Sequence, residues 1–168
     1  MAALVGQSLP HDFDQPMTAT TFHPEPGPWP LGSLVGFEFG QLTADTLAAL
    51  ANSPIRVTPW RMILMEGQGL PSLPGLITIP SDPRLNVTAC TGAPGCPQAL
   101  QPTRDLARRL APQVPHGQHL HVSGCAKGCA HPAPCALTLT ATKQGFTLTR
   151  NGRAGDPGQP FTSLSDAP

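Results

Sequence analysis

The five cysteines of this 168-residue chain constrain its fold most, because all lie within one 46-residue stretch and the first 89 residues contain none. Four form two close pairs, Cys90 with Cys96 and Cys125 with Cys129, and Cys135 follows as a fifth. Each pair lies in a loop rich in glycine and proline, directly after a segment with strand character. We therefore expect two strand ends side by side, with the four paired thiols converging on one site and Cys135 outside it.

Four thiolates suit either a tetrahedral zinc ion or a [4Fe–4S] cluster. Zinc sites favour two to four residues between paired cysteines, so the five residues between Cys90 and Cys96 favour the cluster. The loop glycines would let the backbone approach inorganic sulfides and donate N–H groups to them. These glycines are Gly92, Gly95, Gly124 and Gly128. The alternatives are a zinc site and four unrelated buried thiols.

The charge balance excludes several classes of protein. Ten lysines and arginines match ten aspartates and glutamates, and charged residues make up only 12% of the chain. A generally basic nucleic-acid binder or a polybasic membrane-surface protein is therefore not expected. No apolar run approaches the roughly 20 residues of a membrane span. The first thirty residues also lack the features of a secretory signal, which disfavours a disulfide framework and favours a cytoplasmic location.

Hydrophobic patterning predicts a small β-α-β unit before the cysteines. Alternation indicates a strand over 34–39, and Thr43 is a candidate N-cap for a helix that ends near Ala51. Residues 55–65 are expected to form one long strand, interrupted by Pro59.

The cysteine-bearing part shows a different order of elements. Strands over 85–89 and 119–123 are expected to precede the two cysteine pairs, with a helix over about 102–110 between them. Residues 137–141 and 146–150 are expected to pair as a hairpin.

The cysteine loops resemble the signature of the sulfite/nitrite reductase superfamily, in which Cys-x5-Cys is followed by Cys-x3-Cys. The matching segments are Cys90-Thr-Gly-Ala-Pro-Gly-Cys96 and Cys125-Ala-Lys-Gly-Cys129. Within that superfamily, four segments look most like the precorrin-3B synthase family: 86–90, 92–99, 123–132 and Thr58-Pro59-Trp60-Arg61. The resemblance covers roughly residues 31–155.

The resemblance implies an α+β fold in two parts. Residues 31–75 would be a ferredoxin-like half domain, and residues 76–155 the α/β [4Fe–4S] domain of the superfamily. Residues 1–30 are expected to be a proline-rich, disordered lead-in, and residues 156–168 a disordered tail.

The resemblance also implies a cofactor and a reaction. Each of the four paired cysteines would bind one iron of a [4Fe–4S] cluster, and Cys129 matches the position that bridges to the haem iron in relatives with sirohaem. Sirohaem and a mononuclear non-haem iron are therefore further candidate cofactors. The family's reaction is the oxygen-dependent hydroxylation of precorrin-3A, with lactone formation, in aerobic cobalamin biosynthesis.

Proteins of this superfamily carry two such halves, and this chain matches only the second. We therefore expect an oxidoreductase, or a fragment of one, that is inactive alone and needs an N-terminal half or partner subunit. The electron donor is not identified by the sequence.

Two cations are candidate cofactor-binding residues. Arg61 would contact the carboxylates of a tetrapyrrole or the surroundings of the cluster, and Lys127 lies within the second cysteine loop. The simpler interpretation of each is a solvated cation. Three further arginines, Arg104, Arg108 and Arg109, are expected on a solvated helix face.

The histidines near the second cysteine loop have a weaker interpretation. His119 and His121 share one face of a predicted strand, where a structural role is commoner than metal binding. His131 follows Cys129 by two residues and is a candidate hydrogen-bond donor to the cluster or substrate.

Three other functions remain open at this point. The chain could be an iron–sulfur electron-transfer partner without a substrate of its own, a fragment of a sirohaem sulfite or nitrite reductase, or a zinc-binding module.

Overall fold

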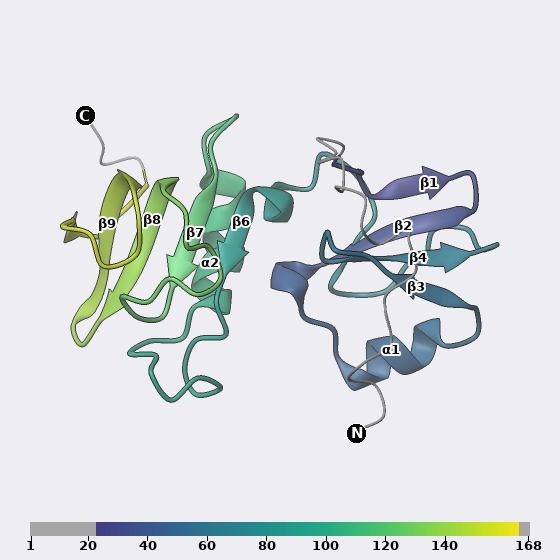
Figure 1. Ribbon diagram of the computed structural model, residues 1–168, viewed down its shortest axis with the longest axis horizontal. Coiled ribbons are helices and arrows are strands. Elements are labelled where there is room, and N and C mark those ends of the chain that lie inside the picture. The colour runs from purple at the N-terminus through teal and green to yellow at the C-terminus, as the bar shows by residue number, and fades with distance from the viewer. Residues whose placement is uncertain (1–22, 165–168) are drawn as a thin grey trace, which may run out of the picture.

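The computed structural model describes residues 23–164, which form two units, each built on its own β-sheet (Figure 1). The first unit contains strands β1 to β5 and helix α1, and the second unit contains strands β6 to β10 and helix α2. No helix in the described part of the chain has the length and apolar character needed to cross a membrane.

The sheet of the first unit has the order β1-β2-β4-β3, and β5 also pairs with β2. Its elements are β1 (Gly27–Trp29), β2 (Gly32–Phe37), the 3-10 turn η3 (Glu38–Gly40), α1 (Ala44–Leu50), β3 (Ile55–Val57), β4 (Met62–Glu66) and β5 (Leu76–Ile77). Because β2 and β3 are both antiparallel to β4, they run parallel to each other on either side of it. The predicted β-α-β unit is therefore present, as a split form with β4 inserted between its two strands.

The single strand expected over 55–65 is wrong, because these residues form the hairpin of β3 and β4. Pro59 lacks the N–H that a continuing strand would need. The backbone N–H and the hydroxyl of Thr58 both donate to the carbonyl of Met62, at 3.1 and 2.8 Å, and close the turn. Arg61 completes the reversal in the left-handed region, with a φ of 58°.

Helix α1 covers the core of the first unit. Leu50 packs with four residues of the sheet, Val35, Ile63, Met65 and Leu76. The helix begins as predicted, since the side chain of Thr43 accepts a hydrogen bond of 3.1 Å from the backbone N–H of Thr46.

Replacing Thr43 with alanine is expected to lower the free energy of unfolding by about 1 kcal/mol, because an N-terminal N–H of α1 loses its partner. Chemical denaturation of the full chain measures this effect. Thr43→Ser keeps the hydroxyl and serves as the control, with an expected loss well below that of the alanine variant. Equal stability of the alanine variant and the original chain would show that solvent replaces the cap.

The sheet of the second unit has the order β10-β9-β8-β7-β6. Its elements are the 3-10 turn η4 (Pro83–Asn86), β6 (Val87–Ala89), α2 (Arg104–Leu110), the 3-10 turn η5 (Ala111–Gln113), β7 (Leu120–Ser123), β8 (Cys135–Thr142), β9 (Gly145–Gly152) and β10 (Gln159–Pro160). Strands β6, β7 and β8 are parallel, and β8 and β9 form the predicted antiparallel hairpin. The sheet buries Leu120, Val122, Leu137 and Leu139 against Ala107 and Leu110 of α2.

Some residues expected in the disordered lead-in and tail belong to strands. Residues 27–29, expected in the lead-in, form the edge strand β1, a position that tolerates Pro28. In place of a disordered tail, β10 pairs with β9 and Leu164 is buried in the core of the second unit. The remainder of the expected lead-in and tail, residues 1–22 and 165–168, lies outside the described residues.

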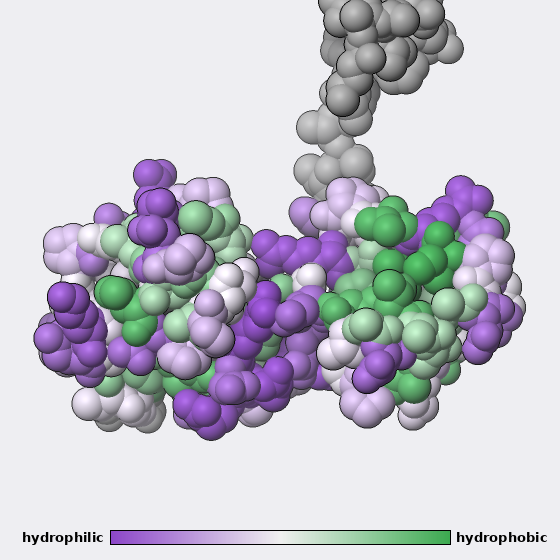
Figure 2. Space-filling model, turned by 90° about the horizontal axis from the view of Figure 1, so that it is seen from below, coloured by the Kyte–Doolittle hydropathy of each residue, from purple (hydrophilic) through white to green (hydrophobic). Residues whose placement is uncertain are grey.

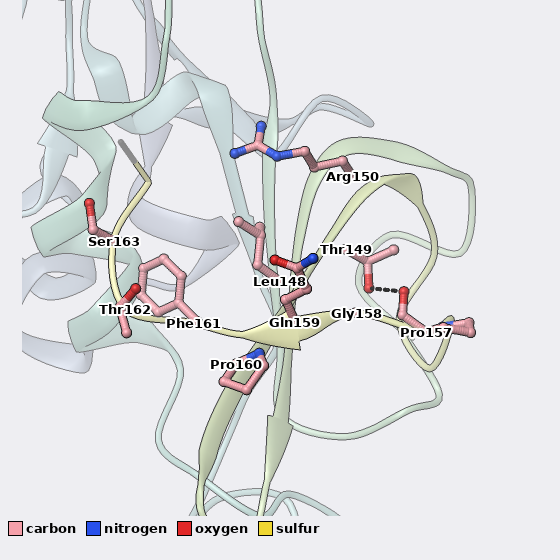
Figure 3. A pocket seen from close by; sticks show the side chains of 10 residues that line it. All are labelled: Leu148, Thr149, Arg150, Pro157, Gly158, Gln159, Pro160, Phe161, Thr162 and Ser163. Atoms are coloured by element: carbon pink, nitrogen blue, oxygen red, sulfur yellow. Dashed lines mark hydrogen bonds between the residues drawn. The ribbon is translucent and has the colours of Figure 1, made fainter. Parts of the chain in front are cut away.

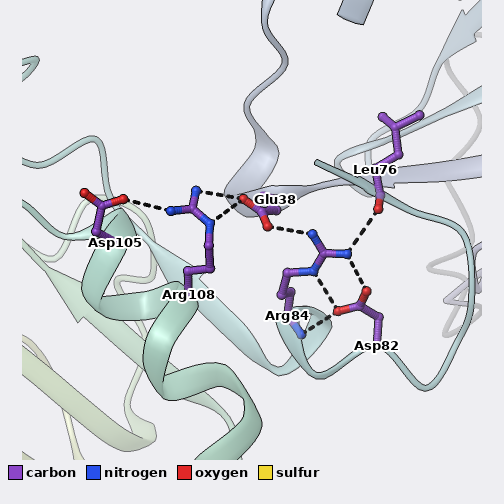
Figure 4. A network of polar contacts seen from close by, with 6 residues as sticks. All are labelled: Glu38, Leu76, Asp82, Arg84, Asp105 and Arg108. Atoms are coloured by element: carbon purple, nitrogen blue, oxygen red, sulfur yellow. Dashed lines mark hydrogen bonds and ion pairs between the residues drawn. The ribbon is translucent and has the colours of Figure 1, made fainter. Parts of the chain in front are cut away.

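An ion-pair network joins the two units (Figure 4). Glu38, the first residue of η3, accepts hydrogen bonds from Arg84 of η4 at 2.6 Å and from Arg108 of α2 at 2.8 and 3.0 Å. Arg84 also pairs with Asp82 at 2.6 Å, and Arg108 with Asp105 at 2.8 Å. Arg108 is therefore not the solvated cation expected from the helix pattern, because its partner comes from the other unit.

Phe39 makes a second connection between the units. It follows Glu38 in the left-handed region, with a φ of 52°, and its ring is buried in the core of the second unit. Gly40 continues the same turn with a φ of 69°. The 3-10 turn η3 thus connects the units twice, through Glu38 in the ion-pair network and through Phe39 in the core of the second unit.

Exposed apolar side chains gather on the first unit, as the green surface of the right-hand lobe in Figure 2 shows. They are Leu31, Leu47, Ile55, Val57, Trp60, Leu70 and Ile79, while Leu100 is the corresponding residue of the second unit. The first unit therefore has a more apolar surface than the second.

Candidate functional site

The two cysteine loops leave the carboxyl ends of neighbouring parallel strands. The first loop follows β6 at Cys90, and the second follows β7 at Gly124. Parallel pairing puts both strand ends at the same edge of the sheet. The backbone N–H of Cys90 donates to the carbonyl of Val122 at 3.1 Å, and that of Leu100 donates to the carbonyl of Gly124 at 2.7 Å. The two strand ends therefore lie side by side, as predicted, and the end of the first loop contacts the start of the second.

Gly124 lies where the two loops meet. Its N–H donates to the sulfur of Cys90 at 2.9 Å. A Cβ at this position would lie 2.8 Å from the Cβ of Ala99 and 3.2 Å from the sulfur of Cys90, so a larger residue would push the loops apart. This N–H to sulfur contact is of the kind expected around a cluster ligand.

Gly92 holds the first loop against the start of α2. It has a φ of 68°, and a Cβ there would lie 2.5 Å from the hydroxyl oxygen of Thr103. That hydroxyl donates to the carbonyl of Cys90 at 2.6 Å. Helix α2, the loop and Cys90 are therefore packed as one piece.

The four paired thiols are not gathered into a metal site. Cys90, Cys96 and Cys125 are partly buried, and Cys129 is exposed. Within residues 23–164, no three histidine, cysteine, aspartate or glutamate side chains are grouped so as to hold a metal ion. The assignment of these four cysteines as ligands thus stays a prediction.

Cys135 lies apart, at the start of β8. Its side chain is buried, and its thiol donates to the carbonyl of His119 at 3.0 Å. Burial raises the pKa of this thiol, and backbone hydrogen bonds only partly oppose that effect. Cys135 is therefore held as a neutral thiol inside the sheet.

A pocket of about 300 Å³ lies between the units, bordered by a cysteine from each loop and by two arginines. It is lined by Cys90, Cys129, Arg61, Arg104, Phe39, Gly40, Ala89, Thr91 and Ala130. These residues come from η3, the β3–β4 turn, the end of β6, the start of α2 and both cysteine loops. The pocket exists only because the two units meet there.

Arg61 bridges from the first unit to the second cysteine loop. Its guanidinium donates to the carbonyl of Ala130 at 3.1 Å. Gly40 makes room for it, since a Cβ there would lie 3.3 Å from the Cδ of Arg61. Lys127, the other predicted cation, is exposed within the same loop and is not among the lining residues.

Arg104 is the site residue that the sequence did not single out. Helical periodicity placed it on a solvated face, but it lines the same pocket as Arg61 from the β3–β4 turn of the first unit. No pattern within α2 could have revealed a neighbour from another unit.

Three imidazoles pack beneath the second cysteine loop. The ring of His131 lies 5.7 Å from that of His119 and 5.6 Å from that of His121, between centroids. His119 shares a hydrogen bond of 2.9 Å with the hydroxyl of Thr88. Burial is the main factor that lowers the pKa of His121 to about 4, so its ring is neutral at neutral pH.

A separate pocket of about 280 Å³ lies between β9 and the chain around β10 (Figure 3). The hydroxyl of Thr149 donates to the carbonyls of Asp156 and Pro157 at 3.2 and 3.3 Å, which fixes this part of the chain. Its single charged lining residue is Arg150, and no cysteine lines it. It does not contribute to the cysteine site.

The residues present fit an iron–sulfur cluster in their chemistry. Four thiols in contacting loops supply the donor set, and the glycine at position 124 already donates its N–H to a sulfur. The buried, neutral Cys135 and the neutral imidazole of His121 are not needed for this set.

Comparison with known proteins gives two findings. The chain is 35% identical over 140 residues to a precorrin-3B synthase from Sinorhizobium sp, covering 71% of this chain. Its fold is similar to the structure of the Mycobacterium tuberculosis NirA protein, with a TM-score of 0.50 and 21% identity over 81% of this chain. No protein-family model matches the chain. The α+β fold class expected for the sulfite/nitrite reductase superfamily is confirmed.

The chain is much shorter than both proteins. It spans 30% of the length of the precorrin-3B synthase and 34% of the NirA chain.

Proposed function

We propose, because this chain is a relative of precorrin-3B synthase, that it forms the [4Fe–4S]-binding part of an oxidoreductase that hydroxylates a precorrin, a tetrapyrrole. The observation that carries this proposal is the contact between the two cysteine loops at neighbouring strand ends, where Gly124 donates to the sulfur of Cys90 at 2.9 Å.

The proposed ligands are Cys90, Cys96, Cys125 and Cys129. When bound, the cluster would supply single electrons to the reaction. The glycine-rich loops would exclude bulky side chains from its sulfides and donate N–H groups to its ligands.

The pocket between the units is the proposed place of the substrate's polar groups. Arg61 would bind a carboxylate of the tetrapyrrole, because a guanidinium donates two parallel hydrogen bonds to that group. Lys127 would contribute positive charge beside the cluster ligands, which favours the more negative, reduced state.

The two proposed parts of the chain are a ferredoxin-like half domain over 31–75 and a [4Fe–4S] domain over 76–155. Since the chain spans 30% of its relative, we propose that turnover needs a complementary half, from the same or another polypeptide. The apolar surface of the first unit supports such a docking partner.

Anaerobic purification of the full chain, followed by iron and acid-labile sulfide analysis, tests the cluster. We expect iron and sulfide in equal amounts and a broad charge-transfer absorption. Zinc without sulfide would overturn the proposal in favour of a zinc-binding module. An intense Soret band would indicate sirohaem, and iron in excess of sulfide would indicate a mononuclear iron.

An iron–sulfur electron-transfer partner without its own substrate is the second candidate, supported by the two contacting cysteine loops, which supply a donor set independently of any substrate pocket. Binding of a carboxylated tetrapyrrole separates the two candidates, because an electron-transfer partner has no need of it.

A further inference from the structure

We propose that Arg104 is a second carboxylate-binding residue of the pocket that Arg61 also lines, so that the two guanidiniums together recognise the acidic side chains of a tetrapyrrole. This inference rests on the proposed substrate class. It adds a residue that neither the cysteine pattern nor the helix pattern marks.

The hydrogen bonds of Arg104 show a side chain that is held in place but incompletely satisfied. One terminal nitrogen donates to the side chain of Gln41, in the first unit. Its Nε is buried and has no hydrogen-bond partner among residues 23–164. A buried, unpaired donor of a charged group is costly, so the acceptors within residues 23–164 leave this guanidinium incompletely satisfied.

The pocket offers no acceptor of its own with negative charge. Its nine lining residues, all within the described part of the chain, include two arginines and no carboxylate. Glu38 borders a neighbouring hollow that Arg104 also lines, but both of its oxygens are taken by Arg84 and Arg108. Arg104 therefore has no carboxylate partner among residues 23–164 and can pair with that of a ligand.

The paired arginines of this chain provide the contrast. Arg84 and Arg108 each contact two carboxylates within 2.8 Å and serve the junction between the units. Arg61 and Arg104 instead face a pocket beside Cys90 and Cys129. Two guanidiniums around one space favour an anion with more than one carboxylate, and the side chains of a precorrin fit this chemistry.

The test measures binding of uroporphyrin, an octacarboxylate tetrapyrrole, to the full chain by fluorescence anisotropy. Arg104→Gln is expected to raise the dissociation constant about tenfold, the scale of a lost hydrogen bond to a charged group. Arg104→Lys keeps the charge but not the paired donors, and its dissociation constant should lie between those of the original chain and Arg104→Gln. The matched control is Arg109→Gln, which removes the same charge from an exposed position of the same helix.

Two further probes define the ligand. The neutral octaamide of uroporphyrin is expected to bind equally to the original chain and to Arg104→Gln, because it lacks carboxylates. Citrate is expected to compete with uroporphyrin more strongly than sulfate does. Should Arg104→Gln fail to fold, Gln41→Leu releases the Arg104 side chain without removing its charge and should weaken uroporphyrin binding by less.

The outcomes separate the inference from the proposed function. Uroporphyrin binding that Arg104→Gln leaves unchanged, or that Arg109→Gln weakens equally, overturns the role of Arg104 and leaves the proposed function standing. Failure of the original chain to bind uroporphyrin overturns both this role and the tetrapyrrole substrate. The iron and sulfide analysis reports on the cluster independently of either result.

Discussion

Replacing Cys90 with serine is expected to reduce the iron and acid-labile sulfide of the anaerobically purified chain to about a tenth or less of the original. The thiolate is the cluster ligand, and a serine hydroxyl, which is far less acidic, replaces it poorly. The same substitution at Cys96, Cys125 or Cys129 should have a similar effect. Iron and sulfide analysis, together with the charge-transfer absorption, measures the loss.

Cys135→Ser is the matched control for this series. Its thiol is buried and donates to the carbonyl of His119, a bond that a hydroxyl can also make. We expect cluster content to remain near that of the original chain. A cluster lost equally from Cys135→Ser, or retained in Cys90→Ser, would show that the ligand set is different from the one proposed.

Replacing Glu38 with glutamine is expected to lower the free energy of unfolding at neutral pH by roughly 1–3 kcal/mol, the range for hydrogen bonds to a charged group. The substitution leaves Arg84 and Arg108 with a neutral partner at the junction between the units. Urea denaturation of the full chain measures the difference. Glu66→Gln is the control, because its partner Arg56 is largely exposed and such pairs contribute little.

The effect of Glu38→Gln is expected to depend on pH. Burial opposes ionisation, but hydrogen bonds from Arg108 and Arg84 outweigh it and lower the pKa of Glu38 below its ordinary value of 4.5. A lowered carboxylate pKa gives stability that is fully present above pH 4.5 and is lost as the pH falls through the folded-state pKa. The difference in unfolding free energy between the original chain and Glu38→Gln should therefore shrink as the pH falls below 4.5. A constant difference from pH 7 to pH 3 would contradict this.

The elements around the cysteines could be predicted because their signals are local. Strand character directly before Cys90 and before Cys125, and the hairpin of β8 and β9, follow from alternation within a few residues. The N-cap of α1 at Thr43 depends only on its own first turn. The expectation that the two strand ends lie side by side followed from the cysteine pairs, each of which comes directly after a strand.

The reversal after Val57 could not be predicted, because apolar residues continue on both sides of it. Residues 55–57 and 62–66 are each regular strands, and a proline inside a run indicates an interruption but not its direction. The hairpin places Arg61 in its turn, and Arg61 is one of the residues that line the pocket.

The contacts between the units were also invisible in the sequence. Arg104 and Arg108 look alike on a helical projection, and only Gln41 and Glu38, which are more than sixty residues away, distinguish their roles. Side chains that are so far apart in the sequence leave no periodic signal when they contact each other. The order around β1 and β10 was missed for the same reason, because each depends on a neighbouring strand.

The burial of Phe39 has a consequence for how the molecule melts. The ring belongs by sequence to the first unit, but it fills space in the core of the second. Loss of the first unit would remove that ring and leave a void, which costs several kcal/mol for a large aromatic side chain. The first unit therefore contributes to the thermal resistance of the second, and we expect a single calorimetric transition. Such a cavity-filling residue also limits recombination, because an incoming first unit must supply a ring of the same size and an incoming second unit must leave the space for it.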